Sequence, residues 1–261
     1  MAELAIIGGS GFYQPGIFTE PKEIEVNTPY GIIQPLLGKA GGVEVVFIPR
    51  HGKEHSLLPH QLNYRANIWG LKELGVKRII STSAVGSLNR KYPPGTMAVI
   101  DQFLDFTKQR PFTFFDQGDA FRAHVDMTEP YCPELRQIII KAAALTKVSV
   151  QPTGCYVCAE GPRYETAAEI KMYQKLGGDV VGMTGVPEVV LARELGICYT
   201  GISTITNWAA GLNQKPLTHH EVVAVMKDNQ DRLRQLILRC LVLAGQSRIN
   251  CECGQNIEGE S

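Results

Sequence analysis

The fold is decided by the run Leu195-Gly196-Ile197-Cys198-Tyr199-Thr200-Gly201-Ile202-Ser203-Thr204-Ile205-Thr206-Asn207. Its β-branched and apolar residues are typical of a buried strand. Because ligands of open α/β sheets bind beyond the carboxyl ends of strands, we expect Asn207 to meet a ligand. A side-chain amide offers a donor and an acceptor, which suits a heterocycle with a carbonyl beside a ring N–H. Alone, the run leaves another interpretation open, in which Asn207 only begins the turn before Ala209-Ala210-Gly211.

The composition is that of an ordinary globular protein. The 261 residues are 44% hydrophobic and 20% charged, which is enough to form one large core. Since 26 basic side chains balance 26 acidic ones, we expect neither nucleic acid nor an acidic membrane surface as a partner. An anionic ligand would have to be held by a local pocket.

The first residues, 1–7, lead directly into a short apolar strand without a basic flank. We therefore expect no secretory signal. No stretch approaches the ~20 apolar residues that a membrane helix needs. These features predict a cytoplasmic enzyme.

Seven cysteines, at positions 132, 155, 158, 198, 240, 251 and 253, form no disulfide-like framework. We expect most of them to be small apolar core residues. Cys155 and Cys158 have the spacing of a redox pair, but they lie in a strand-like run rather than at a helix start, which disfavours redox chemistry. Cys251 and Cys253 lie in a polar tail. The sequence leaves reduced thiols, a local disulfide and an adventitious metal site open for this pair.

Strand-like and helix-like segments alternate along the chain, which predicts an α/β domain with a central sheet. The predicted strands are 4–7, 43–48, 78–83, 96–100, 179–183 and 195–206, and the predicted helices are 61–74, 134–145, 167–175, 187–195 and 218–244. We assign residues 1–248 to one domain and residues 249–261 to a polar C-terminal tail, and we expect residues 250–261 to be loose. Residues 108–126 are expected to form an irregular excursion near the site or an interface.

The first predicted strand runs into the glycine-rich sequence Gly8-Gly9-Ser10-Gly11-Phe12. Such a loop lets backbone N–H groups approach an oxyanion, and Ser10 adds a hydroxyl donor. The dinucleotide fingerprint Gly-x-Gly-x-x-Gly fails because position 14 is Gln, and the Gly-Lys-Ser/Thr of a P-loop is missing here. A tight structural turn and an anion-binding loop are equally compatible with this sequence.

Other strand ends carry small hydroxyl residues, one arginine and one histidine, a set that suits phosphate. They are Arg50 and His51 after the second strand, Ser83 and Ala84 after the third, and Thr184 after the fourth. His51, His55 and His60 also suggest zinc. Gly52 and Pro59, however, prevent a shared helical face, and no acidic or cysteine cluster completes such a site. We therefore expect no metal in the site.

Five motifs, in this order, resemble the trimeric purine nucleoside phosphorylase and methylthioadenosine phosphorylase family over almost the whole chain. They are Ile7–Gly11, Pro49–Gly52, His60–Asn67, Glu160–Thr166 and Gly182–Glu188. The resemblance implies a single α/β domain with a central mixed sheet flanked by helices, active as a homotrimer or a dimer of trimers. It also implies a pentosyltransferase that converts a purine nucleoside and phosphate to free purine and pentose 1-phosphate. Phosphate is then a co-substrate, and no cofactor is expected.

The resemblance implies site residues as well. Phosphate is placed among Ser10, Arg50, His51, Ser83, Ala84 and Thr184, the ribose against Met183, and the base near Glu165, Asn207, Trp208 and Ala209. We expect His51 to act as a neutral donor and expect it to share the catalytic role with Asn207. Because the transition state carries positive charge on the sugar and negative charge on the departing purine, catalysis needs positioning and electrostatics more than a protein nucleophile.

The overall pattern is most similar to the methylthioadenosine phosphorylase branch, but three residues depart from it. Asn207 replaces an aspartate, Glu165 replaces a small hydroxyl residue, and His219 replaces an aliphatic residue. The Asn207 amide can donate to O6 of a 6-oxopurine and accept from N7–H, while Glu165 can accept from N1–H. His219 would bind a 5′-hydroxyl, unless it only caps the last helix. His124 matches a segment that a neighbouring subunit lends to the pocket.

These residues predict a 6-oxopurine nucleoside phosphorylase that acts on inosine and guanosine in purine salvage. The nearest alternative is phosphorolysis of S-methyl-5′-thioadenosine or S-methyl-5′-thioinosine. Two other classes fit less well. A catalytically silent nucleoside-binding module would not need the intact phosphate set, and a dinucleotide oxidoreductase would need the glycine fingerprint that fails here.

Overall fold

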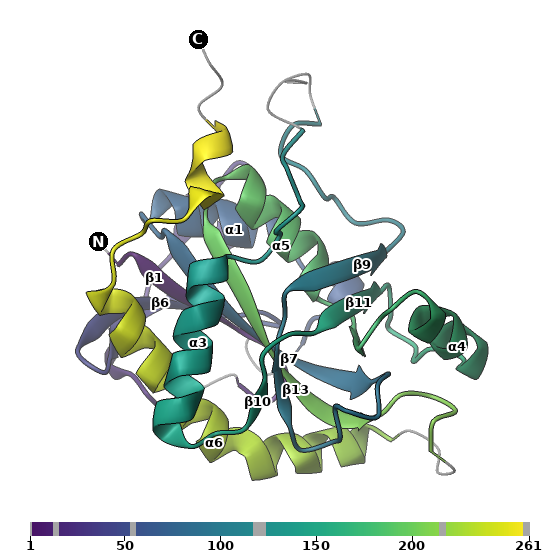
Figure 1. Cartoon of the computed structure of the whole chain (residues 1–261). Coiled ribbons are helices and arrows are strands. Elements are labelled where there is room, and N and C mark those ends of the chain that lie inside the picture. The colour runs from purple at the N-terminus through teal and green to yellow at the C-terminus, as the bar shows by residue number, and fades with distance from the viewer. Residues whose placement is uncertain (1, 13–15, 53–55, 117–123, 214–217, 258–261) are drawn as a thin grey trace.

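The computed structural model describes residues 2–12, 16–52, 56–116, 124–213 and 218–257, apart from the side chains of residues 219 and 255–257. Its centre is an eleven-stranded mixed sheet (Figure 1). The strands are β1 (Leu4–Gly8), β2 (Thr19–Glu23), β5 (Leu36–Ala40), β6 (Val43–Pro49), β7 (Arg78–Ser87), β8 (Met97–Val99), β9 (Gln102–Phe106), β10 (Val150–Gln151), β11 (Cys155–Ala159), β12 (Val180–Gly182) and β13 (Cys198–Trp208). A separate hairpin pairs β3 (Val26–Thr28) with β4 (Gly31–Ile33).

The main path of the sheet runs in the order β10-β8-β13-β7-β1-β6-β5-β2. At its middle, β6, β1, β7 and β13 are parallel neighbours. Antiparallel pairs join β8 to β13 and β5 to β6. The carboxyl ends of the four parallel strands therefore meet at one edge, which is where an open α/β sheet places its ligands.

Five α-helices cover the sheet within the described residues: α1 (Tyr64–Glu73), α3 (Pro133–Thr146), α4 (Ala167–Lys175), α5 (Gly185–Glu194) and α6 (His219–Gln246). The described part of the chain also contains two short 3₁₀ helices, η2 (Pro59–Gln61) and η3 (Glu252–Ile257). Helices α3 and α6 pack against each other on one face of the sheet, and α1 and α5 pack on the other (Figure 1). Helix α4 lies beside β11 and β12.

The two faces of the sheet follow from residue alternation in the strands. In β1, Leu4 and Ile6 join the core beneath α3 and α6, whereas Ala5 and Ile7 join the core beneath α1 and α5. Alternating side chains point to opposite faces of a strand, so an apolar run supplies both layers at once. The same holds for β13, whose β-branched and apolar residues are buried along nearly its whole length.

The predicted fold class, a central mixed sheet flanked by helices, is confirmed. Each predicted strand and helix is present, with ends that differ by up to three or four residues. The strands β2, β3, β4, β5, β9 and β10 were not predicted, because they are short or exposed and carry little apolar patterning. The domain boundary between residues 248 and 249 stays a prediction.

The third predicted strand does not end at Ser83. Strand β7 continues to Ser87, pairing with β13 along its whole length and with β12 at its far end. Ser83 and Ala84 therefore lie within a long strand rather than in a loop after one. The sequence Ala84-Val85-Gly86-Ser87 resembled a turn, but pairing with two neighbouring strands keeps it extended.

The expectation that residues 250–261 are loose is wrong for residues 250–257. Cys253 is only 4% exposed, and η3 packs against α5. The Arg78 guanidinium donates to the carbonyl oxygens of Ser247 and Arg248, at 3.1 and 2.8 Å. Two cysteine side chains supply the segment with apolar contacts that its polar average composition conceals. Residues 258–261 lie outside the described residues.

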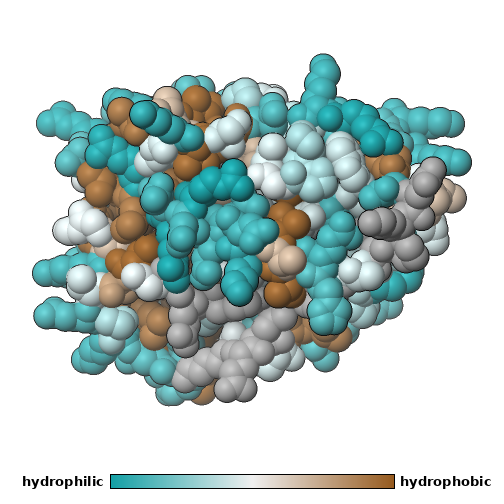
Figure 2. Space-filling view, turned by 90° about the horizontal axis from the view of Figure 1, so that it is seen from below, coloured by the Kyte–Doolittle hydropathy of each residue, from teal (hydrophilic) through white to brown (hydrophobic). Residues whose placement is uncertain are grey.

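Across the described parts of the chain, no helix combines the length and the apolar character needed to span a bilayer. Figure 2 shows the molecule from below the view of Figure 1, with hydrophobic side chains distributed among hydrophilic ones. Such a mixture is normal for a protein surface, since apolar atoms contribute more than half of it.

Helix α3 offers a matched test of this packing. Leu135 is fully buried beneath α3, whereas Leu145 on the same helix is 53% exposed. Leu135→Ala should lower the free energy of unfolding by about 2–5 kcal/mol, because it removes buried methyl groups and leaves a cavity. Leu145→Ala should change it by less than about 1 kcal/mol. Denaturant titration measures both, and similar losses would contradict the layer assignment.

Candidate active site

A cavity of about 380 Å³ opens at the carboxyl edge of the parallel strands. That volume suits a small ligand. Ten of the site residues predicted from the sequence line it: Ser10, Arg50, His51, Ser83, Ala84, Glu165, Met183, Thr184, Asn207 and Ala209. These residues come from six separate segments of the chain, so the fold itself assembles the predicted set.

Two predicted residues that the structure describes, Trp208 and His124, do not line the cavity. Trp208 is half-buried beside it, with the Arg90 guanidinium 4.8 Å from the ring centroid. His124 is exposed, which leaves its expected role toward a neighbouring subunit untested. His219 begins α6, and its side chain lies outside the described residues. His55, part of the rejected zinc interpretation, also lies outside them.

Arg50 and Glu188 form an ion pair at the wall of the cavity, with exposures of 3% and 1%. The Arg50 Nε and Nη2 atoms donate to the carboxylate at 2.9–3.0 Å, and Nη1 donates to the Thr82 carbonyl at 2.7 Å. Burial alone would lower the pKa of Arg50, but Glu188 raises it above its ordinary value, so the guanidinium stays charged. Three elements thus fix the orientation of one cation.

In the glycine-rich loop after β1, Thr82 and Arg50 pack directly against the backbone of Gly9. The Gly9 amide donates to the Thr82 hydroxyl at 3.0 Å, so this N–H is not aimed at a ligand. A Cβ on Gly9 would meet the Thr82 carbonyl and would lie 2.6 Å from Arg50 Nη1. Only glycine permits this approach. Of the two interpretations left open by the sequence, the structural turn accounts for Gly9, while the hydroxyl-bearing Ser10 lines the cavity.

His51 is 4% exposed, and its Nδ1 lies 2.9 Å from the Leu57 carbonyl oxygen. A carbonyl only accepts, so Nδ1 carries a proton. His51 thus uses its Nδ1–H as a donor within the protein, and its expected role as a neutral donor to phosphate stays a prediction.

The turn from β12 into α5 brings Thr184 into the cavity. The Thr184 amide donates to the Tyr156 hydroxyl at 3.2 Å. Burial raises the pKa of Tyr156 to about 12, so this anchor remains a neutral phenol. The helical path is interrupted at Val186, whose φ of −119° and ψ of 133° are extended. Thr184 and Gly185 therefore form an irregular turn that leads into the helix.

Arg110 holds the segment that carries Met183. It is 6% exposed, and its Nη1 donates to the carbonyls of Met183 and Val186 at 2.7 Å each, while Nη2 donates to the Glu160 carbonyl at 2.7 Å. Gly161 leaves room for Met183, because a Cβ there would lie 2.6 Å from its sulfur and φ is +68°. The Met183 side chain is thus positioned by an arginine and a glycine that do not themselves line the cavity.

Asn207 lies at a β-bulge. The ladder between β13 and β7 shifts register between Ile205 and Asn207, which leaves Thr206 as the extra residue. The Asn207 Nδ2 donates to the Trp208 carbonyl at 3.0 Å, and its Oδ1 accepts from the Thr206 hydroxyl at 2.7 Å. Since a carbonyl cannot donate, this network fixes which side of the amide is nitrogen. One N–H and one lone pair remain for a ligand.

Glu165 adds a carboxylate to the cavity just before α4. Burial raises its pKa above the ordinary value for a glutamate, and the nearby Arg163 only partly opposes this. The next residue, Thr166, caps α4 by accepting from the Glu169 amide at 3.1 Å, in a capping box. The helix start therefore fixes the backbone from which Glu165 extends. The cavity combines a buried cation with an amide and a carboxylate suited to a heterocycle.

Sequence reasoning missed four positioning residues: Thr82, Arg110, Tyr156 and Glu188. A signal existed for Glu188, the one acid in the apolar run 186–192. Charged residues are rarely buried unless paired, which made an arginine partner a natural inference. No sequence signal pointed to Arg110, because it lies in the irregular segment 108–116 and reaches its partners only through the tertiary fold.

Among the described residues, one cluster contains three or more potential metal ligands, and this cluster lies outside the cavity. The cluster contains four cysteines at the opposite end of β13. The cavity residues therefore suggest an anion and a heterocycle as ligands.

The chain matches the family model described as "Phosphorylase superfamily" over residues 3–242. It is 50% identical over 265 residues to the 6-oxopurine nucleoside phosphorylase of Pyrococcus furiosus, covering 99% of each chain. It is also 50% identical over 259 residues to the S-methyl-5′-thioadenosine phosphorylase of Pyrococcus horikoshii, covering 97% and 96%.

A solved methylthioadenosine phosphorylase from Schistosoma mansoni, in complex with adenine, has a similar fold. The TM-score is 0.92 at 33% identity, covering 98% of this chain and 96% of the other. The family resemblance and the enzyme class expected from the sequence are thereby confirmed. With the family model and close relatives spanning nearly its whole length, the chain belongs to the phosphorylase superfamily.

Proposed function

We propose that this protein is a 6-oxopurine nucleoside phosphorylase. It converts inosine or guanosine and phosphate reversibly to hypoxanthine or guanine and ribose 1-phosphate. One observation carries the proposal: the fixed Asn207 amide shares a cavity with the Glu165 carboxylate. This pair offers a donor to O6, an acceptor to N7–H and an acceptor to N1–H, as the 6-oxopurine edge requires.

Phosphate occupies the cationic end of the cavity in this proposal. Its partners are Ser10, Arg50, His51, Ser83, Ala84 and Thr184, which all line the cavity. Arg50 supplies permanent charge, held in place by Glu188 and Thr82. Phosphate attacks the anomeric carbon, the glycosidic bond breaks, and the phosphate dianion balances the positive charge that develops on the sugar. Phosphate is a co-substrate of the proposed reaction, which needs no cofactor.

The departing purine gains negative charge as the glycosidic bond breaks. N7 takes a proton from solvent as the bond breaks. Asn207 then accepts from N7–H through Oδ1 and donates to O6 through Nδ2, so the base leaves as a neutral species. Hydrogen-bond partners already fixed by Thr206 and Trp208 need little reorganisation in the transition state. Met183 packs against the ribose, and Ala209 borders the base.

The proposal also covers the 5′ end of the nucleoside and the contribution of a neighbouring subunit. His219 donates to or accepts from the 5′-hydroxyl, and His124 serves the pocket of a neighbouring subunit in a trimer or a dimer of trimers. Exposed Leu57 and Leu58 line the cavity, and a second hollow of about 420 Å³ shares Arg50 and Leu57 with it. A subunit interface would cover such apolar side chains. Cytoplasmic action is part of the same proposal.

Phosphorolysis of S-methyl-5′-thioadenosine or S-methyl-5′-thioinosine is the second candidate. The name of the Pyrococcus horikoshii relative supports it at an identity equal to that of the 6-oxopurine enzyme. Asn207 and Glu165 favour the 6-oxopurine, because adenine has no N1–H and would leave the partly buried Glu165 carboxylate unpaired. Such a loss costs about 1–3 kcal/mol.

Arg50 and Arg78 allow a controlled test of the phosphate end. Arg50→Lys keeps a positive charge but loses the forked geometry, so the KM for phosphate should rise about tenfold or more. Arg78→Lys alters an equally buried arginine that binds carbonyls near the C-terminus, and it should leave this KM unchanged. Steady-state kinetics at saturating inosine measure both. Equal effects would remove Arg50 from the phosphate site.

Asn207→Asp tests base recognition. A carboxylate cannot donate to O6, whereas it can accept from both N7–H and the 6-amino group of adenine. The ratio of kcat/KM for inosine to that for adenosine should fall about 10- to 100-fold, which corresponds to one unpaired polar contact. An unchanged ratio would show that Asn207 does not discriminate between the bases.

Glu165 predicts a pH-dependent selectivity. Its raised pKa means that the carboxylate becomes protonated as the pH falls, at a higher pH than an ordinary glutamate. The charged form accepts from N1–H of inosine, while the protonated form can donate to N1 of adenosine. The inosine-to-adenosine ratio of kcat/KM should therefore fall from about pH 8 to about pH 5. Taking a ratio cancels the titration of phosphate itself.

Glu165→Gln is the matched control for this pH effect. The amide still accepts through its carbonyl oxygen but does not titrate, so the ratio should become independent of pH over the same range. A ratio that falls equally in both proteins would assign the effect to another group.

A further inference from the structure

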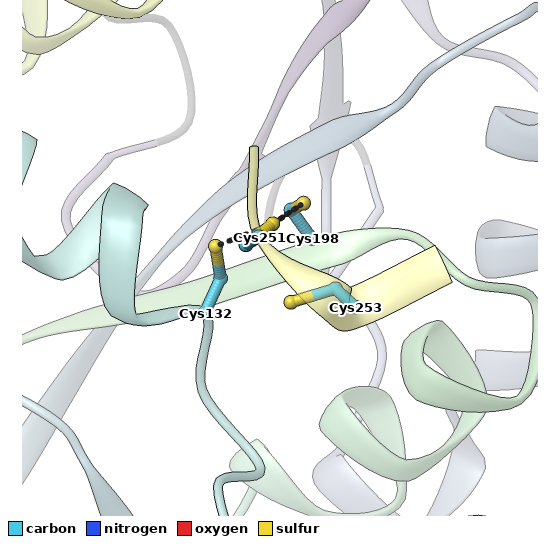
Figure 3. A group of neighbouring side chains, drawn as sticks. All are labelled: Cys132, Cys198, Cys251 and Cys253. Atoms are coloured by element: carbon cyan, nitrogen blue, oxygen red, sulfur yellow. Dashed lines mark hydrogen bonds between the residues drawn. The ribbon is translucent and has the colours of Figure 1, made fainter. Parts of the chain in front are cut away.

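Four cysteines form a cluster far from the cavity. Cys132 directly precedes α3, Cys198 begins β13, and Cys251 and Cys253 belong to the C-terminal segment around η3. Figure 3 shows their sulfur atoms pointing toward one another from these three parts of the chain. All four Sγ atoms lie within 4.8 Å of one another. Sequence separation concealed this cluster, since Cys132 and Cys251 are 119 positions apart.

The sulfur separations fit a shared metal ion better than direct bonds. Cys251 Sγ lies 3.3 Å from Cys198 Sγ and 3.6 Å from Cys132 Sγ. A disulfide requires about 2.05 Å between its sulfurs. In a tetrahedral zinc site with Zn–S bonds of about 2.3 Å, neighbouring sulfurs are about 3.8 Å apart. The observed sulfur–sulfur distances are close to this tetrahedral value. Small shifts of the four side chains would bring all of them to it.

The surroundings suit a buried thiolate centre. Cys132, Cys198 and Cys253 are each under 5% exposed, so the ion would be shielded from water on most sides. Cys132 occupies the N-cap position of the 14-residue helix α3, where the positive end of the helix favours a thiolate. Separate contacts already hold the segment there, including the Asn250 amide donating to Glu134 at 3.0 Å.

We propose that Cys132, Cys198, Cys251 and Cys253 together bind one zinc ion in a tetrathiolate site. Zn²⁺ favours four thiolates in tetrahedral geometry, and a site with four protein ligands is structural because it leaves no position for substrate. On binding, each cysteine S–H loses its proton to solvent, and four Zn–S bonds form without any change of oxidation state. The ion fastens the C-terminal segment to α3 and β13.

The position of the site supports a structural role. Asn207 lies nine residues beyond Cys198 along β13, which at about 3.3 Å per residue places it about 30 Å from the cluster. Loss of the ion should therefore alter stability and leave the cavity largely intact. The proposal does not depend on which nucleoside the cavity accepts.

The test uses the full chain, expressed in zinc-supplemented medium and purified with a phosphine reductant and without chelators. Metal content is measured by mass spectrometry after gel filtration, for the unaltered protein and for Cys251→Ser/Cys253→Ser. Cys155→Ser is the control, since this half-buried cysteine lies outside the cluster. A second preparation, purified without any reductant, is used to count disulfides by intact mass. Cobalt(II) added to metal-free protein reports tetrahedral thiolate ligation by its visible absorption.

The proposal requires about one zinc per chain in the unaltered protein and in Cys155→Ser, and close to none in the double variant. Removal of zinc should lower the Tm by about 5 °C or more, reversibly on adding zinc back. Because the double variant could fold poorly, the cobalt spectrum of the unaltered protein provides an independent reading. The proposal would be overturned if the four cluster cysteines were free thiols and no metal was retained. Two disulfides per chain in protein freshly purified without reductant would also overturn it.

Discussion

The bidentate pair between Arg50 and Glu188 is the interaction on which the arrangement of the cavity depends. Burying two charges is costly, and an apolar pair of the same size would often stabilise a protein as well or better. The main effect of the pair is therefore to hold neighbouring elements of the cavity in place, rather than to stabilise the fold. It joins the end of β6 to helix α5, and the contact of Arg50 with Thr82 adds β7. Breaking it would leave an unpaired charge at the wall of the cavity.

The other end of the cavity depends on a local irregularity in the sheet. The bulge in β13 directs Asn207 toward the cavity, and the glycine opposite, Gly86, leaves the space that this amide occupies. A Cβ on Gly86 would lie 3.2 Å from Asn207 Nδ2. Regular pairing would have turned alternate residues into the layers above and below the sheet. A cation that follows β6 and an oriented amide on β13 thus face the same cavity, although β1 and β7 lie between these two strands.

Much of this could be predicted from local patterns. Apolar runs identified the central strands, and polar residues after them identified Arg50, Thr184 and Asn207 as cavity residues. Tertiary partners were not predictable in the same way, because Arg110 binds carbonyls 49 to 76 positions away. The tail was misjudged for a similar reason: average polarity hid two cysteines whose partners lie more than 50 positions earlier. Short exposed strands such as β2 lacked the alternation that identifies a strand.

The central claim is that the unaltered protein cleaves 6-oxopurine nucleosides by phosphorolysis. The most direct measurement is release of free base from inosine, guanosine, adenosine, S-methyl-5′-thioadenosine and S-methyl-5′-thioinosine, with and without phosphate. The account predicts rapid, strictly phosphate-dependent cleavage of inosine and guanosine, with adenosine and S-methyl-5′-thioadenosine nearly inert. Preferential cleavage of S-methyl-5′-thioadenosine, or base release without phosphate, would contradict it.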